Sequence, residues 1–230
     1  AYPELQMVTH TIYGISATPM VMCDERGNTV IFDAIDNKWT ETFARSIAIN
    51  MGGRGMIALY AATVKQLKEA AVLNTLTLAE KIGKTVRTAR HQEENPVDAV
   101  RQAVDGYIIF TGKITDVQRR LITGFARGTC RFDGMNQFVG SELVINFQNE
   151  YLVAIQDGRL IATTPDLIAV LDLETGEPIT TEILRYGMRV AVIAFPCDPK
   201  WRTPKGLELV GPRYFGYDID YIPVEEAYGG

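Results

Sequence analysis

Histidine and cysteine are scarce in this chain of 230 residues, which limits the chemistry that it can carry. The two histidines, His10 and His91, are far apart, and no CxxC, HxH or HExxH pattern is present, so no metal site is predicted. The three cysteines, Cys23, Cys130 and Cys197, are odd in number and widely spaced, which argues against a disulfide framework. Such cysteine usage is typical of a reducing cytoplasm, where we expect the protein to be.

Long apolar runs are also missing. No stretch approaches the roughly 20 apolar residues that a membrane-spanning helix needs, and the first residues lack the charged start and apolar stretch of a signal peptide. The formal net charge of −5 argues against a nucleic acid or an anionic membrane as a partner. With 47% hydrophobic and 22% charged residues, the composition is that of an ordinary globular protein.

The first half of the chain is predicted to be rich in helices. A hairpin is expected around the turn at residues 24–28, where Gly27 and Asn28 tolerate positive φ. Helices are then expected within residues 37–53, near Val64–Val72, after the capping-box pattern Thr77-Leu78-Ala79-Glu80, and from Asn95-Pro96 onward. In the first of them Trp39, Phe43 and Ile47 recur every four residues, which predicts its apolar face.

The second half is predicted to consist of strands and tight turns. "YLVAIQDGRLIAT" is the strongest hairpin signal, because Asp157-Gly158 suits a two-residue type I′ turn. A further hairpin is expected at residues 167–184, with "ITTEIL" as its second strand. "MRVAVIAFP" is interpreted as a buried strand, and the chain beyond Pro196 as a wrapping tail rich in proline, glycine and aromatic residues.

Together these elements predict an α+β fold, with a helix-containing first half followed by a β-rich C-terminal half. We expect two domains, an α+β domain with several helices at residues 1–110 and a β-rich domain at residues 111–230. The boundary is expected near residues 106–115, where no flexible linker marks it.

Two kinds of candidate site residue also have plainer interpretations. Cys130 is flanked by arginines, which would lower a thiol pKa, but without a nearby histidine a buried inert cysteine is favoured. Arg119, Arg127 and Arg131 share parity, so within one strand they could face one way and bind an anion, although ordinary surface charge is equally compatible.

Two other sequence patterns could indicate ligand binding. Asp218 and Asp220 would share one side of a strand and could hold a hard cation, but a solvated strand face is favoured. The run Gly52-Gly53-Arg54-Gly55 follows a helix instead of preceding one, so it lacks the context of a phosphate-binding loop.

The polar run "ETGEPITTEILRYG" has two parts, an expected turn and a segment that could border a site. "ETGEP" has the glycine and proline of a turn, which favours solvent exposure. In "ITTEILRYG", as a strand, Thr180 and Glu182 would lie on one face and Thr181 and Arg185 on the other, so neither face is purely apolar. Such a mixture permits a cleft or a subunit interface.

Several runs together carry a family resemblance: "YPELQM", "NMGG", "FARG", "FQNE", "PDLIAVLDLETGEPITTEILRYG", "WRTP" and "GL–LVGPR–FGYD–DY". From Tyr2 to about Tyr221 the chain resembles the S-methyl-thiohydantoin-desulfurase-like family, long filed as a domain of unknown function. Its members are often encoded beside hydantoinase and oxoprolinase components. Full-length members carry an upstream α/β region with a "GTGGGG"-like segment, so this chain is expected to match the later part of the family protein.

The resemblance implies a cytoplasmic protein in the turnover of hydantoin-like cyclic amides. We expect part of an enzyme that hydrolyses or desulfurises a hydantoin-like or thiohydantoin-like ring, with Glu150 or Glu182 as the acid or base. The other matching polar positions are candidate substrate-binding residues, although each could be a turn, a cap or a buried structural pair: Arg127, Asn149, Asp166 and Arg185.

An alternative is a non-catalytic partner subunit of a hydantoinase-type or oxoprolinase-type complex. The tail "PRYFGYDIDYIPVEEAY" is rich in aromatic residues, as the cores of interfaces often are. A homo-oligomer is also compatible with this composition. The sequence identifies no cofactor, and activity could depend on the upstream glycine-rich region.

Overall fold

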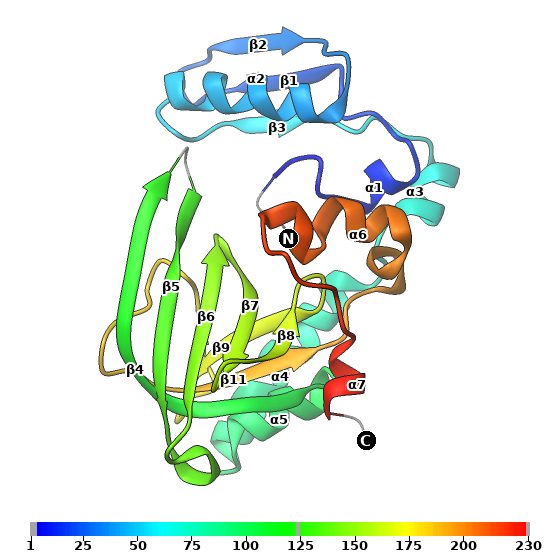
Figure 1. Ribbon diagram of the computed structural model, residues 1–230. Helices are drawn as coiled ribbons and strands as arrows, with labels where there is room; N and C mark the ends of the chain where they lie inside the picture. The colour runs from blue at the N-terminus through cyan, green and yellow to red at the C-terminus, as the bar shows by residue number, and fades with distance from the viewer. Residues whose placement is uncertain (1–3, 123–124, 229–230) are drawn as a thin grey trace. The chain divides into compact units, whose positions relative to one another are not determined.

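The chain forms two compact units, Ala1–Leu73 and Asn74–Gly230. A computed structural model describes residues 4–122 and 125–228, and Figure 1 shows their helices and strands. Tyr2 and Pro3 of the run "YPELQM" lie outside the described residues. Across the described ranges no helix is long and apolar enough to cross a membrane.

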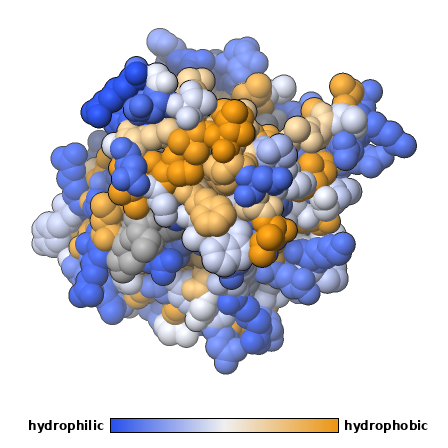
Figure 2. All heavy atoms as spheres, turned by 90° about the horizontal axis from the view of Figure 1, so that it is seen from above, coloured by the Kyte–Doolittle hydropathy of each residue, from blue (hydrophilic) through white to orange (hydrophobic). Residues whose placement is uncertain are grey.

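The first unit contains a small antiparallel sheet in the order β2-β1-β3. Its elements are α1 (Thr9–Ile12), β1 (Met20–Cys23), β2 (Thr29–Phe32), α2 (Asn37–Asn50), β3 (Met56–Ala58) and α3 (Val64–Ala70). The predicted hairpin is confirmed, since β1 pairs with β2 and the N–H of Asp24 donates to the carbonyl of Asn28 at 3.0 Å. Some apolar side chains remain at the surface, including Ile31, Ile35 and Met56. Figure 2, the view from above, shows hydrophobic side chains gathered near its centre.

Helix α2 begins and ends on clear local signals. The carboxylate of Asp36 accepts the N–H of Trp39 at 2.7 Å and caps the start. At the end, the N–H groups of Gly52 and Gly53 donate to the carbonyls of Ile49 and Ala48 at 3.1 and 2.8 Å. Both glycines have positive φ, as this type of helix ending requires.

The predicted apolar face of α2 is wrong for two of its three residues. Trp39 and Phe43 are 47% and 41% exposed, whereas Ala44 is buried against Met20 and Met22 of β1. The long methionine side chains fill the space beside the sheet, so the helix lies on its small residues. Phe43 instead places its ring 6.0 Å from that of Phe32 and 5.5 Å from that of Trp39.

The second unit joins helices to an antiparallel sheet of eight strands, in the order β10-β9-β11-β4-β5-β6-β7-β8. The strands are β4 (Tyr107–Ile122), β5 (Phe125–Gly134), β6 (Glu142–Gln148), β7 (Glu150–Gln156), β8 (Arg159–Thr163), β9 (Leu167–Asp172), β10 (Pro178–Ile179) and β11 (Arg189–Phe195). The helices are α4 (Thr75–His91), α5 (Pro96–Ala103), α6 (Pro204–Val210) and α7 (Val224–Tyr228), with short 3-10 turns between them. The predicted α+β fold is confirmed.

The two helices before the sheet test the predicted start signals. Helix α5 is capped by Asn95, whose side chain accepts the N–H of Val97 at 2.9 Å, as predicted. Helix α4 begins at Thr75, so the predicted capping box at Thr77 is wrong and lies inside the helix. The left-handed backbone of Asn74 turns the chain earlier. The division into domains at residue 110 stays a prediction.

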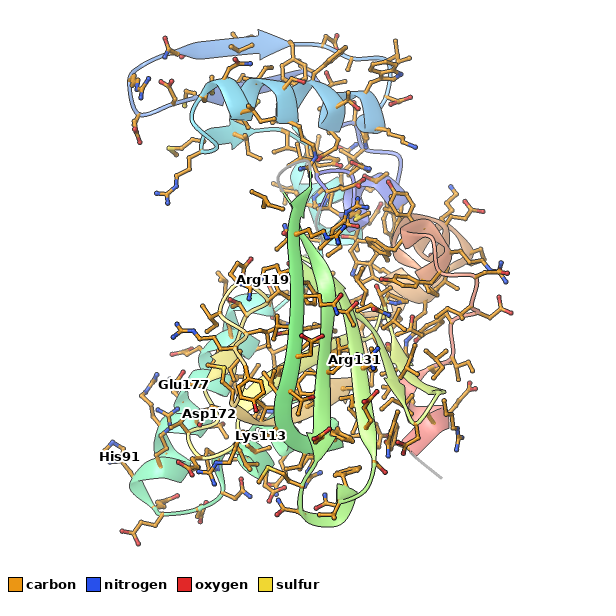
Figure 3. The ribbon with its side chains drawn as sticks, turned by 60° about the vertical axis from the view of Figure 1, so that its left-hand side comes forward. His91, Lys113, Arg119, Arg131, Asp172 and Glu177 are labelled. Atoms are coloured by element: carbon orange, nitrogen blue, oxygen red, sulfur yellow. The ribbon has the colours of Figure 1, made fainter. Side chains whose placement is uncertain are left out.

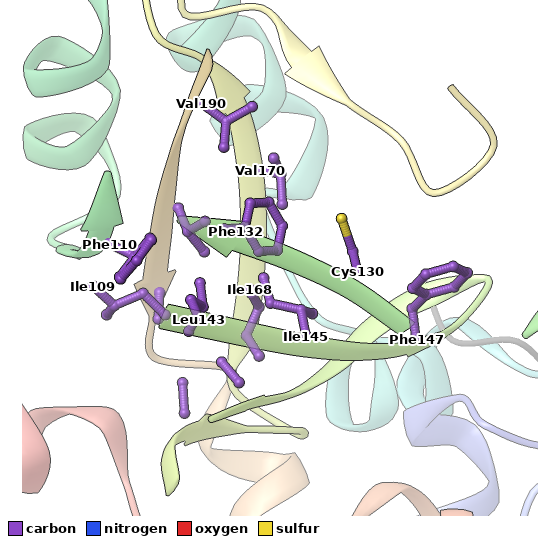
Figure 4. Packing of buried hydrophobic residues seen from close by; sticks show 14 of the residues in the cluster. Ile109, Phe110, Cys130, Phe132, Leu143, Ile145, Phe147, Ile168, Val170 and Val190 are labelled. Atoms are coloured by element: carbon purple, nitrogen blue, oxygen red, sulfur yellow. The ribbon is translucent and has the colours of Figure 1, made fainter. Parts of the chain in front are cut away.

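Strand β11 is buried on both faces, which explains its unbroken apolar run. Val190 and Val192 pack into a cluster inside the sheet, where Figure 4 also shows Phe110 and Phe132. Ala191 and Ile193 face the other way and pack with valines of α4 and α5. Because successive side chains alternate between faces, one strand serves two hydrophobic clusters.

The hairpin predicted at residues 167–184 forms only in part. Strands β9 and β10 pair, but β10 ends at Ile179, and Thr181–Ile183 form a turn. The prediction of a strand through "ITTEIL" is therefore wrong. Here side chains from other segments bind the backbone carbonyls in place of a neighbouring strand. The predicted Asp157-Gly158 turn is confirmed by positive φ at both residues, 49° and 80°.

Two glycine substitutions test this description of the helices. Gly83→Ala, in the interior of α4, is expected to raise the free energy of unfolding by about 0.5–1 kcal/mol because alanine favours the helix. Gly52→Ala is expected to lower it by about 1 kcal/mol, since φ at this position is 84°. Calorimetric or urea unfolding of the two variants measures both values, and an equal effect of the same sign would contradict the assignment.

Candidate functional site

The junction of β6 and β7 positions Glu150, and Asn149 forms this junction. Asn149 has φ 57°, and its N–H donates to the carbonyl of Ala126 at 2.8 Å. Its side-chain oxygen accepts the N–H of Ala126 at 3.0 Å, and its carbonyl accepts the hydroxyl of Thr181 at 2.6 Å. These bonds hold the chain reversal and fix the half-buried Glu150 at the first position of β7.

The loop at residues 180–188 carries Glu182, and several side chains hold it. Thr181 is 1% exposed and makes the bond to Asn149. The guanidinium of Arg119, on β4, donates to the carbonyl of Glu182 and, at 2.9 Å, to that of Leu184. Just before the loop, the hydroxyl of Tyr151 donates to the carbonyl of Ile179 at 2.7 Å. Figure 3 shows Arg119 on its strand.

Glu150 and Glu182, which we call the carboxyl pair, have pKa values shifted in opposite directions. Burial raises the pKa of Glu150, and the nearby charge of Glu182 raises it further. The hydroxyl of Thr180 lowers the pKa of Glu182 by hydrogen bonding to its carboxylate, and the charge of Arg119 adds to this effect. The surroundings therefore favour the protonated form of Glu150 and the ionised form of Glu182, relative to free glutamate side chains.

Cys130 lies close to this region but is not activated. Its side chain is fully buried, and Figure 4 shows it beside Phe132 and Phe147. Burial raises the pKa of its thiol to about 12, with a further contribution from the charge of Asp116. A thiol with this pKa is a poor nucleophile at neutral pH, so the favoured sequence interpretation, a buried inert cysteine, agrees with the structure.

The arginines of β4 and β5 do not form the predicted cluster. Arg119 lies opposite Gly128, whereas Arg120 lies opposite Arg127. Directly opposed residues share a face of the sheet, so Arg119 faces the other way from Arg127 and Arg131. The prediction was wrong because the chain reverses between β4 and β5. Even-numbered residues of β4, such as Arg120, therefore share a face of the sheet with odd-numbered residues of β5, such as Arg127. Arg131 also binds Glu142 at 2.7 Å.

Asp166 belongs to a separate, structural network. It is 3% exposed, and its oxygens accept four bonds, at 2.6 Å from Arg202, 3.0 Å from the hydroxyl of Tyr221, and 3.0 and 2.9 Å from the N–H groups of Cys197 and Val224. The network ties the chain end to the start of β9. Asp166 as a substrate-binding residue stays a prediction, but all four bonds are to the protein itself.

Arg127 and Arg185 are exposed. Arg127 lies opposite Gln148 of β6, and its charge opposes the rise that burial causes in the pKa of Tyr217. Arg185 comes two residues after the turn at residues 181–183 that contains Glu182. The structure thus links the segments of Asn149, Glu150 and Glu182 through the bond from Thr181 to Asn149 and through the effect of the Glu182 charge on Glu150. The sequence interpretation did not include Arg119 or Tyr151, whose positions depend on strand pairing.

No metal centre is evident in the part of the chain that the structure describes. Within it, no three His, Cys, Asp or Glu side chains are grouped so that they could hold an ion. Asp218 and Asp220 do not lie on a strand, and both bind Arg213, at 2.7 and 2.9 Å. His91 is the last residue of α4, which Figure 3 shows.

A family model described as "S-Me-THD-like, C-terminal domain" matches residues 35–224. The chain belongs to the S-Me-THD-like family. The model of the family's N-terminal domain matches residues 1–34. A crystal structure of a protein from Chromobacterium violaceum superposes with a TM-score of 0.75 and 22% sequence identity, which shows a shared fold. The match covers 97% of this chain and 64% of that one, so this chain spans about two thirds of its length at most. The comparison with curated proteins gave no match.

Replacing Asp166 tests the structural network. Asp166→Ala is expected to lower the free energy of unfolding by about 3–5 kcal/mol, because Arg202 and two N–H groups lose a buried acceptor. Asp218→Ala is the control, since this exposed carboxylate binds only the exposed Arg213 among the described residues, and we expect a change within about 0.5 kcal/mol. Urea unfolding measures both. Equal effects would show that the buried network contributes little.

The carboxyl pair predicts opposite dependences of stability on pH. The raised pKa of Glu150 gives stability that is complete below its unfolded pKa, near about 4.3, and is lost as pH rises through the folded pKa. The lowered pKa of Glu182 gives stability that is present above its unfolded pKa and is lost as pH falls. Relative to wild type, Glu150→Gln should therefore gain stability with rising pH, and Glu182→Gln should lose it.

Urea unfolding at about pH 3 and about pH 8 measures these differences, because the two conditions lie well on either side of an unfolded glutamate pKa of about 4.3. An equal change in the free energy of unfolding between the two pH values for both variants would show that the two carboxyl groups do not differ in environment.

Proposed function

We propose that this chain supplies an acid–base pair to an enzyme that acts on hydantoin-like or thiohydantoin-like cyclic amides, by hydrolysis or desulfurisation. Family membership supports the substrate class. The observation that carries the proposal is the bond from Thr181 to Asn149, which joins the segments of Glu150 and Glu182, two carboxyl groups whose pKa values shift in opposite directions. Enzymes commonly assign acid and base roles through environments that move two titratable groups apart.

The two roles follow from the directions of these pKa shifts. Glu150, with the raised pKa, would be the general acid, and Glu182, with the lowered pKa, the general base. In hydrolysis, Glu182 takes a proton from the water that adds to the ring carbonyl carbon. The carbon–nitrogen bond then breaks as Glu150 protonates the leaving nitrogen. In desulfurisation, the carbon–sulfur bond breaks instead, and Glu150 protonates the leaving thiolate.

Asn149 is proposed to orient the ring. Its side-chain oxygen accepts the N–H of Ala126, and this bond directs the side-chain nitrogen of Asn149 away from Ala126. This nitrogen has no partner among the described residues, so it can donate to a ring carbonyl. Arg127 and Arg185 remain proposed substrate-binding residues. The cytoplasmic location also remains a proposal.

Turnover of hydantoin and thiohydantoin substrates by the full protein tests this proposal. Glu150→Gln and Glu182→Gln are each expected to lower kcat by about 10²-fold or more, which is typical for the loss of a general acid or base. Loss of the acid should also remove the alkaline limb of the pH–rate profile. Glu177→Gln is the control, because this exposed side chain binds Arg90. Wild-type kcat in both pair variants would overturn the proposal.

The partner-subunit alternative has one supporting observation. Ile183 and Tyr186, on the same loop as Glu182, are 42% and 74% exposed and could contact another protein. By contrast, the aromatic tail is partly used within the chain, since Tyr221 binds Asp166. Co-purification with a hydantoinase-type subunit that Tyr186→Ser abolishes, together with normal turnover in Glu150→Gln, would favour the partner role.

A further inference from the structure

The first unit contains a cavity of about 380 Å³ beside α2. Its apolar wall consists of Leu5, Met20, Met22, Ala44, Ala48 and Ile57. Its charged side chains are Glu41, Arg45 and Arg54, and Gly53 and Gly55 complete the rim. We call this space the methionine groove. Its volume lies within the range of sites for small molecules.

Local structure explains why the groove is open. Alternation along β1 directs Met20 and Met22 toward α2, where both are buried. Ala44 and Ala48 are four residues apart on the helix, so small side chains follow one another along the facing side. The turn at Gly52 and Gly53 then returns the chain so that Arg54 lines the same space.

The charges of the groove do not cancel. Glu41 is 6% exposed, accepts the N–H of Leu5 at 2.7 Å and forms an ion pair with Arg45. Arg54 is exposed and forms no ion pair or hydrogen bond within the described part of the chain. The groove thus has an ion pair between the half-buried Arg45 and the buried Glu41 on one side, and the available guanidinium of Arg54 at the rim.

We propose that the methionine groove binds a small carboxylic acid with an apolar body. The carboxylate would pair with Arg54, whose planar guanidinium fits two carboxylate oxygens. The body would lie on the accessible apolar side chains of Leu5, Ala48 and Ile57, while the buried Met20 and Met22 close the floor beneath them. This inference goes beyond the proposed function, since the groove shares no residue with the carboxyl pair.

A carboxylate fits better than a phosphate. Phosphate sites usually offer several free backbone N–H groups at a loop or helix start. Here the N–H of Gly53 already donates to the carbonyl of Ala48, and the loop follows α2 instead of preceding a helix. One available arginine beside an apolar wall matches a monoanion with a hydrophobic group.

Titration of the chain with 3-phenylpropanoate tests the proposal. Calorimetry gives the dissociation constant, and NMR of isoleucine methyl groups labelled with carbon-13 shows whether Ile57, which lines the groove, responds. The neutral 3-phenylpropanamide has nearly the same shape and is expected to bind at least about tenfold more weakly, because it lacks the charge-assisted bonds.

Three variants locate the binding site. Arg54→Gln is expected to weaken binding of 3-phenylpropanoate at least about tenfold. Arg26→Gln, in the turn between β1 and β2, is the matched control and should bind as wild type does. Ala48→Leu should abolish binding by filling the groove, while leucine preserves the helix. Circular dichroism confirms that the variants are folded.

Several outcomes would overturn the proposal. They are undetectable binding of 3-phenylpropanoate, equal affinity for the amide, and equal losses in Arg54→Gln and Arg26→Gln. Sedimentation equilibrium tests another occupant: a concentration-dependent dimer that Ala48→Leu disrupts would assign the groove to a second copy of the chain. None of these outcomes depends on turnover, so the result is independent of the proposed function.

Discussion

The hydrogen bond from the hydroxyl of Thr181 to the carbonyl of Asn149 joins the two segments on which the candidate site depends. One segment is the reversal between β6 and β7, and the other is the loop after β10. Each segment carries one member of the carboxyl pair. Thr181 is almost completely buried, so its hydroxyl needs a partner, and the bond holds the two segments together. The bond therefore helps to fix the position of Glu182 relative to Glu150.

Arg119 supports the same arrangement by a different route. Its two bonds go to backbone carbonyls of the loop, not to a carboxylate, so its charge remains close to Glu182 while its geometry fixes the backbone. This placement helps to keep Glu182 ionised. Glu150, which is more deeply buried, is affected mainly by loss of water. Two glutamate side chains thus have pKa values that their surroundings shift in opposite directions.

Polar groups elsewhere in the second unit stabilise the fold. Asp166 gathers donors from three later segments of the chain, and Asp172 holds the turn before β10 by accepting the N–H groups of Glu174 and Thr175 at 3.1 and 2.8 Å. Such carboxylates resemble site residues in a sequence. Their hydrogen bonds show instead that they accept backbone N–H groups that are buried or lie in turns, and such groups need partners in any folded chain.

Local signals in the sequence determined the α+β class, the hairpins at residues 24–28 and 157–158, and the cap of α5, because each depends on neighbouring residues. The face of α2, the end of β10 and the opposite orientations of Arg119 and Arg127 depend on partners distant along the chain. Glu150, Asn149 and Glu182 could be nominated from their residue types and family resemblance. Only the tertiary structure decided how they are linked, because strand pairing and burial set the bonds and charges around each group.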